Sequence, residues 1–232
     1  MKGKLKFTTL MVVIALAFLV FGCAEQKAEQ GKSAETKSPA AEEAKKKAAE
    51  DPTKENPLVV DEANGIVKIY AEVNGKYFSE TTRHGVVFKD GSNGDKSILR
   101  AYANQNDFYN ALVKIGAKPG NTLTLQSAPG TKVTGDALDV KVSFGGKTYD
   151  FSQVVKQEPD NGFNVRFGGN EQRAKDKNTG CILCLDSCPV GITSNDTWGF
   201  GDWQNGKVKF YGDKDKLPED GSPVIVSFSV KK

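Results

Sequence analysis

The sequence contains little histidine, methionine or cysteine and has no strong excess of either charge. Among 232 residues there are 1 histidine, 2 methionines and 4 cysteines, with 32 basic and 29 acidic side chains. This balance disfavours nucleic acid as a partner, which a clustered basic excess would usually indicate. A single histidine without a serine- or cysteine-centred elbow motif leaves nucleophilic hydrolysis unsupported, and no G-x4-G-K-S/T phosphate loop occurs. These absences favour a role other than that of an enzyme.

Long apolar runs are also absent, except for one at the N-terminus. It covers residues 10–21, follows three lysines and ends at Gly22-Cys23. This pattern predicts a signal peptide over residues 1–22, and the run is too short for a spanning helix. Residues 20–23 resemble the lipobox of bacterial lipoproteins, which implies an acyl lipid (diacylglycerol) on Cys23. The alternative is an uncleaved N-terminal anchor. Both predict an extracytoplasmic chain attached to a membrane of the cell envelope.

Residues 24–57 contain no large apolar side chain. Such a segment cannot bury enough surface to offset the entropy lost on ordering. The sequence therefore predicts a disordered tether over residues 23–57 and a single domain over residues 58–232.

Within that domain, short apolar runs bounded by turn residues predict strands. They cover residues 66–73, 85–89, 97–103, 122–127, 137–144, 147–151, 163–167, 208–211 and 224–230. Residues 106–115 carry apolar side chains at helical spacing, with Asn106 or Asp107 as the expected cap, and predict one main helix. We therefore expect a β-rich α+β fold of about eight or more short strands, with one main helix and a cysteine-bearing loop.

Three of the four cysteines lie within eight residues, at Cys181, Cys184 and Cys188. Their spacing, C-x2-C-x3-C-P, matches the last three ligands of the bacterial ferredoxin run, and the first ligand would fall at Asn178. The sequence predicts a metal-binding loop over residues 180–189. Asp186 or His84 is the possible fourth ligand.

Three interpretations of these cysteines stay open. The first is an iron–sulfur cluster on all three, although a cluster built in the cytoplasm would not survive export of an unfolded chain. The second is thiol chemistry of the pair Cys181 and Cys184, with Cys188 resolving a mixed disulfide or holding a soft metal such as Cu(I) or Zn. The third is a structural disulfide, as is common outside the cytoplasm.

Four segments look like the YdjY-type domain family of bacterial lipoproteins. They are residues 55–60, 82–91, 115–120 and 180–192. The resemblance covers most of residues 55–230. The family is commonly described as a 4Fe-4S ferredoxin type, so the resemblance implies an iron–sulfur cofactor.

The sequence as a whole predicts a membrane-anchored, extracytoplasmic accessory protein for redox or electron-transfer reactions. Its site would be an iron–sulfur or related metal centre on the three cysteines. The expected partners are the membrane, through the lipid anchor, and a redox protein of unknown identity. The alternative is a non-catalytic binding or structural lipoprotein in which a disulfide staples the cysteine loop.

Overall fold

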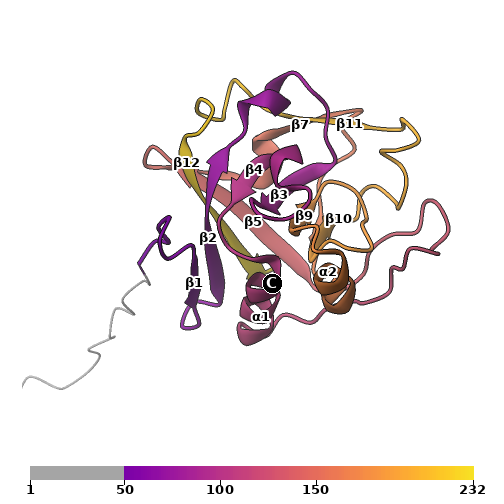
Figure 1. Cartoon of the computed structure of the whole chain (residues 1–232), viewed down its shortest axis with the longest axis horizontal. Coiled ribbons are helices and arrows are strands. Elements are labelled where there is room, and N and C mark those ends of the chain that lie inside the picture. Colours follow the sequence, from indigo (N-terminus) through magenta and orange to yellow (C-terminus); the bar gives the residue numbers. More distant parts are fainter. Residues whose placement is uncertain (1–49) are drawn as a thin grey trace, which may run out of the picture. The chain divides into compact units, whose positions relative to one another are not determined.

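The computed structural model describes residues 50–232 (Figure 1). The strands are β1 (Leu58–Asp61), β2 (Ile66–Val73), β3 (His84–Phe88), β4 (Ser97–Ala101), β5 (Ala137–Phe144), β6 (Lys147–Asp150), β7 (Val155–Glu158), β8 (Val165–Arg166), β9 (Cys181–Cys184), β10 (Thr193–Asn195), β11 (Lys209–Gly212) and β12 (Pro223–Val230). The α-helices are α1 (Gln105–Lys114) and α2 (Glu171–Lys177), and short 3-10 helices cover Gly75–Phe78, Gly94–Lys96 and Phe151–Gln153. Among residues 50–232, no helix is long and apolar enough to cross a membrane. The predicted signal peptide, Cys23 and most of the predicted tether lie outside the described residues.

Eight strands pair in a closed ring, in the order β2, β12, β5, β8, β10, β9, β3 and β4, and β4 pairs back with β2. The pairs β3–β4 and β9–β10 are parallel, and the other pairs in the ring are antiparallel. β1 extends the sheet beside β2, and β6 pairs with β5. The expected α+β class with one main helix is therefore wrong: the fold is an eight-stranded barrel with two short helices.

The barrel interior is built from strands whose apolar side chains alternate with more exposed ones. β2 alternates partly exposed and buried residues along its whole length, and β12 does so along most of its length. This period of two places one face of each strand in the core. Phe228 of β12 packs edge-on against Phe108 of α1, with ring centroids 4.7 Å apart, which joins the first helix to the sheet.

α1 begins one residue earlier than expected, and Asn104 caps it in place of Asn106 or Asp107. The Asn104 side chain accepts a hydrogen bond of 2.8 Å from the Asn106 backbone N–H. This bond satisfies one of the N–H groups that the first helical turn leaves without a partner.

We expect Asn104→Ala to lower the free energy of unfolding by about 1 kcal/mol, because the capping bond is lost. Urea denaturation followed by circular dichroism measures this change. Asn110→Ala on the exposed face of the same helix is the control, and it should leave stability unchanged or slightly raised. An equal loss in both variants would contradict the capping role.

Two further expectations are wrong. Residues 122–127 form no strand; most of them are exposed, and Thr124 and Ser127 hydrogen-bond across a turn. The cysteine segment is not a loop outside the sheet, because Cys181 and Cys184 belong to β9 and only Cys188 lies in the turn that follows. All four residues of β9 are buried, so no alternating pattern marks the strand in the sequence.

Candidate metal centre

β9 lies between β3 and β10 in the barrel wall, and this position sets the surroundings of two cysteines. In the antiparallel register with β3, Cys184 faces His84 and Cys181 faces Val87, with register irregularities between these pairs. In the parallel register with β10, Cys184 faces Ser194. Such irregularities re-aim side chains in a strand.

His84, Cys181 and Cys184 form a compact group. Their ligand atoms, one imidazole nitrogen and two Sγ atoms, all lie within 4.8 Å of one another. The Sγ of Cys181 is 3.7 Å from His84 Nδ1 and also 3.7 Å from Asn93 Nδ2. Both cysteines are fully buried, whereas His84 is partly exposed. The group is therefore reached from solvent through its histidine.

Cys188 extends this group. Its thiol interacts with that of Cys184, which also interacts with the Cys181 thiol. The three cysteines pack together with Val87 and Val190 and stand apart from the main apolar core. All three are free thiols, and none of the described residues forms a disulfide. Of the three thiols, Cys184 is therefore the one that interacts with both of the others.

The start of α2 holds the turn that carries Cys188. Asn170, which precedes the helix, donates from Nδ2 to the carbonyl oxygens of Cys188 and Gly191, each at 3.1 Å. Arg173 donates from Nε to the Pro189 carbonyl at 2.7 Å. These bonds fix the turn from the outside, so the position of Cys188 does not depend on its own sulfur.

The thiols differ in acidity. The hydrogen bond from Cys184 lowers the pKa of Cys181 well below its ordinary value, and His84 lowers it further against the effect of burial. The same bond raises the pKa of Cys184, and its bond to Cys188 and its burial add to the rise. The bond from Cys184 also lowers the pKa of Cys188, with help from the charge of Arg83. Cys181 and Cys188 therefore ionise before Cys184, whose single S–H can donate to either of them.

This order predicts the order of alkylation. The thiolate is the reacting form, so iodoacetamide should label Cys181 several-fold faster than Cys184 in the metal-free protein at pH 7. Lowering the pH should slow the labelling of Cys184 before that of Cys181. Peptide mapping by mass spectrometry after short pulses measures both rates. Faster labelling of Cys184 would contradict the ionisation of Cys181 before Cys184.

Asp186 is close to the cysteines in the sequence but belongs to an ion pair. Its Oδ1 accepts from Arg83 Nε at 2.8 Å and lies 2.7 Å from the second guanidinium nitrogen. Burial raises the pKa of Asp186 to about 6, although Arg83 opposes the rise. Burial lowers the pKa of Arg83, but the negative charges of Cys188 and Asp186 outweigh this effect and raise the pKa above its ordinary value. Of the two possible fourth ligands, the structure places His84, and not Asp186, in the group with Cys181 and Cys184.

A single metal ion fits this group better than an iron–sulfur cluster does. Metal–sulfur bonds of about 2.3 Å in a tetrahedral site place neighbouring sulfurs about 3.8 Å apart. The ligand atoms of His84, Cys181 and Cys184 lie within 4.8 Å of one another, close to that spacing. In a 4Fe-4S cluster each thiolate binds a different iron atom, so the sulfurs must stand farther apart. The donor set of imidazole and thiolates suits soft ions such as Cu(I) and Zn(II).

Asn178, where the ferredoxin pattern would place its first ligand, ends α2 instead. Its φ of 42° is left-handed. Asparagine adopts that conformation more readily than most residues, which explains why an asparagine stands at the end of this helix. Its side chain accepts a hydrogen bond from Gln105 at 3.2 Å, so it joins α1 to α2.

Several residues around the cysteines were not predicted as part of the site. They are Asn93, Asn170, Thr179, Gly191 and Ser194. Asn93, Asn170 and Ser194 lie near a cysteine because strands or turns that are separate in the sequence meet around β9, and Gly191 lies against Cys184. Thr179 lies two residues before Cys181. The spacing of the cysteines carries no signal for these residues.

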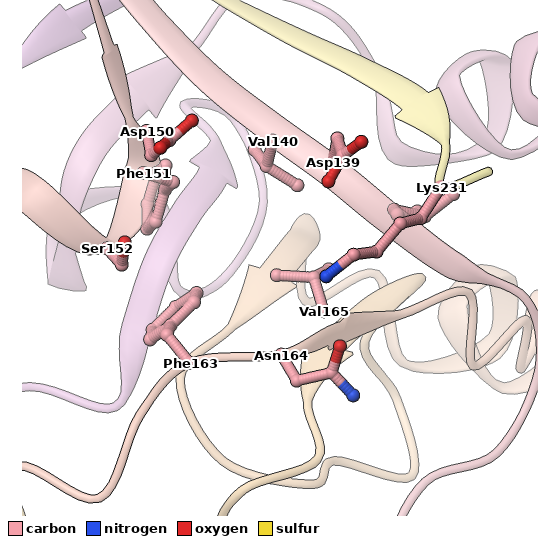
Figure 2. A pocket seen from close by; sticks show the side chains of 10 residues that line it. Asp139, Val140, Asp150, Phe151, Ser152, Phe163, Asn164, Val165 and Lys231 are labelled. Carbon is pink, nitrogen blue, oxygen red and sulfur yellow. The ribbon is translucent and has the colours of Figure 1, made fainter.

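A separate hollow of about 180 Å3 lies beside β5, at Asp139, Asp150, Phe163, Asn164 and Lys231 among others (Figure 2). Figure 2 shows the Lys231 amine and the carboxylates around an open space, without any cysteine. This hollow is not part of the candidate metal centre.

The fold and the site together define a β-barrel protein with a cysteine-rich candidate metal centre in its wall. The chain belongs to the YdjY domain family, whose model matches residues 58–229, so the family predicted from the sequence is confirmed. It is 44% identical over 177 residues to a protein of Escherichia coli (strain K12) described as "Uncharacterized protein YdjY". The matched region covers 75% of this chain and 79% of that protein. No solved structure matches this chain.

Proposed function

We propose that this chain is an accessory protein for redox or electron-transfer reactions, built around one thiophilic metal ion. His84, Cys181 and Cys184 would hold the ion, and Cys188 is the nearest further donor. The single observation that carries the proposal is the convergence of the three ligand atoms within 4.8 Å. One neutral imidazole and two or three thiolates form a donor set typical of Cu(I), Zn(II) and thiolate-bound iron.

The surroundings of the group support a charged thiolate site. Arg83 is mostly buried, at 12% side-chain exposure, and its positive charge lowers the pKa of Cys188. This charge offsets part of the negative charge that deprotonated cysteines bring into the barrel wall. Burying thiolates without such compensation would be costly.

His84 gives the site its route to a partner. It is the partly exposed member of the group, whereas the cysteines are buried. When bound, a redox-active ion would supply the electron chemistry, and the chain would hold the ion away from water and expose it only through the imidazole. We further propose that Cys23 carries the lipid that ties the domain to a membrane of the cell envelope. The redox partner would then be a protein at that membrane.

Metal analysis of the full chain, purified without oxygen, tests the proposal. We expect one ion of copper or iron per chain and no acid-labile sulfide; one zinc ion would support the metal site but contradict the redox role, because Zn(II) has no redox chemistry. Titration of the metal-free chain with Co(II) should give sulfur-to-cobalt charge-transfer absorption with a stoichiometry of one. His84→Ala should weaken Co(II) binding, whereas the exposed control Lys209→Ala should not.

Two results would overturn the single-ion proposal. Iron and labile sulfide in cluster ratios, with visible absorption, would instead support the iron–sulfur centre that the cysteine spacing predicts. A disulfide among the three cysteines in a chain that binds no metal would support the alternative of a disulfide-stapled binding lipoprotein.

A further inference from the structure

Two hydroxyl groups beside the cysteines lack hydrogen-bond partners. Ser194 Oγ and Thr179 Oγ1 are both buried, and neither makes a hydrogen bond of ordinary geometry. Ser194 as a whole is 0% exposed. Buried hydroxyl groups in proteins are nearly always hydrogen-bonded, and each exception asks for an explanation.

Ser194 lies directly against the middle cysteine. It is the register partner of Cys184 in the β9–β10 pair. A Cβ atom added to Gly191 would lie 2.8 Å from Cys184 Sγ and 3.3 Å from Ser194 Oγ. The sulfur and the hydroxyl therefore both lie close against residue 191, where only glycine fits without displacing the sulfur.

Thr179 lies two residues before the first cysteine, and Asn93 links the two. Asn93 Nδ2 lies 3.7 Å from Cys181 Sγ, and the Thr179 hydroxyl is buried without a hydrogen bond of ordinary geometry. The backbone around it is held in place: Asn93 N–H donates to the Thr179 carbonyl at 3.2 Å, and Ser92 N–H donates to the Asn178 carbonyl at 3.0 Å. Thr179 and the Cys181 sulfur are therefore both fixed beside Asn93.

We propose that Ser194 and Thr179 are positioning residues, which donate O–H···S hydrogen bonds to the Cys184 and Cys181 thiolates when a metal ion binds. The inference rests on the proposed function. A neutral thiol is a weak acceptor, whereas a thiolate is a strong one. Metal binding removes the thiol protons to solvent and leaves the sulfurs as anions. In the metal-bound chain both hydroxyl groups then stand beside sulfurs that are permanently anionic and are stronger acceptors than thiols.

This arrangement assigns opposite effects to the same hydroxyl in the two states. Without metal, an unpartnered buried hydroxyl lowers the stability of the fold. With metal, it adds a hydrogen bond that orients the ligand and withdraws electron density from the sulfur. A residue with a purely structural role would change the stability of the metal-free and the metal-bound chain in the same direction.

Ser194→Ala and Thr179→Val test the inference in the full chain, with Co(II) and Zn(II) as probes. We expect the melting temperature of the metal-free variants to be unchanged or higher. We expect the dissociation constant for Co(II) to rise about tenfold in each variant. The sulfur-to-cobalt charge-transfer band should move to lower energy, because the thiolates lose a hydrogen bond. Thr179→Ser, which keeps the hydroxyl, should restore both the affinity and the band.

Ser187→Ala is the matched control. Ser187 is a buried serine of the same segment, but its hydroxyl already donates to the Trp198 carbonyl at 2.7 Å and accepts from Val133 N–H at 3.0 Å. Its loss should lower the melting temperature of the metal-free chain and leave the charge-transfer band in place.

The outcomes separate this inference from the proposed function. If the unaltered chain binds neither Co(II) nor Zn(II), the proposed function fails and this inference fails with it. If the unaltered chain binds metal but Ser194→Ala and Thr179→Val bind it with the same affinity and the same band, only this inference is overturned. A lower melting temperature in the metal-free variants, in proportion to the lost affinity, would also overturn it in favour of a packing role.

Discussion

Cys184→Ala is expected to weaken binding of Co(II) or Zn(II) by more than about 100-fold, which corresponds to about 2.7 kcal/mol. Cys184 lies within 4.8 Å of the ligand atoms of His84 and Cys181. Its thiol also interacts with those of Cys181 and Cys188. Without it, Cys181 is the only sulfur left in the group of three converging ligand atoms. Competition titrations against a chelator of known affinity measure the loss.

Two variants make this result specific. Val87→Ala removes apolar volume from the same small cluster but no ligand atom, so it should lower stability and leave metal affinity nearly unchanged. Cys188→Ala should produce a smaller loss of affinity than Cys184→Ala, because Cys188 lies outside the group of three converging ligand atoms. Wild-type affinity in Cys184→Ala would refute a site centred on the middle cysteine.

Local pattern predicted most strands of this protein but not their closure into a barrel. β5, β6 and β12 carry periodicity or turn signals that act within a few residues, and the structure has them within a residue or two of the expected bounds. Closure depends on the pairing of β2 with β4 and of β9 with β3. When both faces of a strand are buried, its own sequence does not indicate which strand it pairs with. This applies to β9, whose four residues are all buried.

The spacing of the cysteines carried information about the site that periodicity could not. It singled out Cys181, Cys184 and Cys188, and these three do pack together. It could not choose between His84 and Asp186, because the choice depends on where β3 crosses β9. In the folded chain His84 faces Cys184 across that pair, and the Asp186 carboxylate is bound by the guanidinium of Arg83.

Arg83→Met is expected to lower the free energy of unfolding by about 3–5 kcal/mol near pH 8. Arg83 donates to Asp186, whose side chain is 0% exposed, and the carboxylate has no other hydrogen bond of ordinary geometry. Removing the guanidinium leaves a buried carboxylate without a counter-charge. Chemical denaturation of the metal-free chain measures the effect without interference from metal binding.

The loss of stability in Arg83→Met should depend on pH in a predictable direction. In the wild type, burial already raises the pKa of Asp186 from 3.8 to about 6, and loss of Arg83 should raise it further. A carboxyl group with a raised pKa in the folded state binds more protons there than in the unfolded state, so stability falls as pH rises between the two values. The penalty of Arg83→Met should therefore be smaller at pH 5 than at pH 8.

Two further variants separate the buried ion pair from a general effect of lost charge. Arg83→Met/Asp186→Asn removes both charges and replaces the carboxylate by an amide of nearly the same volume. It should restore most of the lost free energy of unfolding and remove the pH dependence of the loss. Lys141→Met breaks an exposed pair with Asp150 and should cost less than about 1 kcal/mol at either pH. If Arg83→Met cost no more than Lys141→Met, the buried pair could not be a large contributor to the stability of the fold.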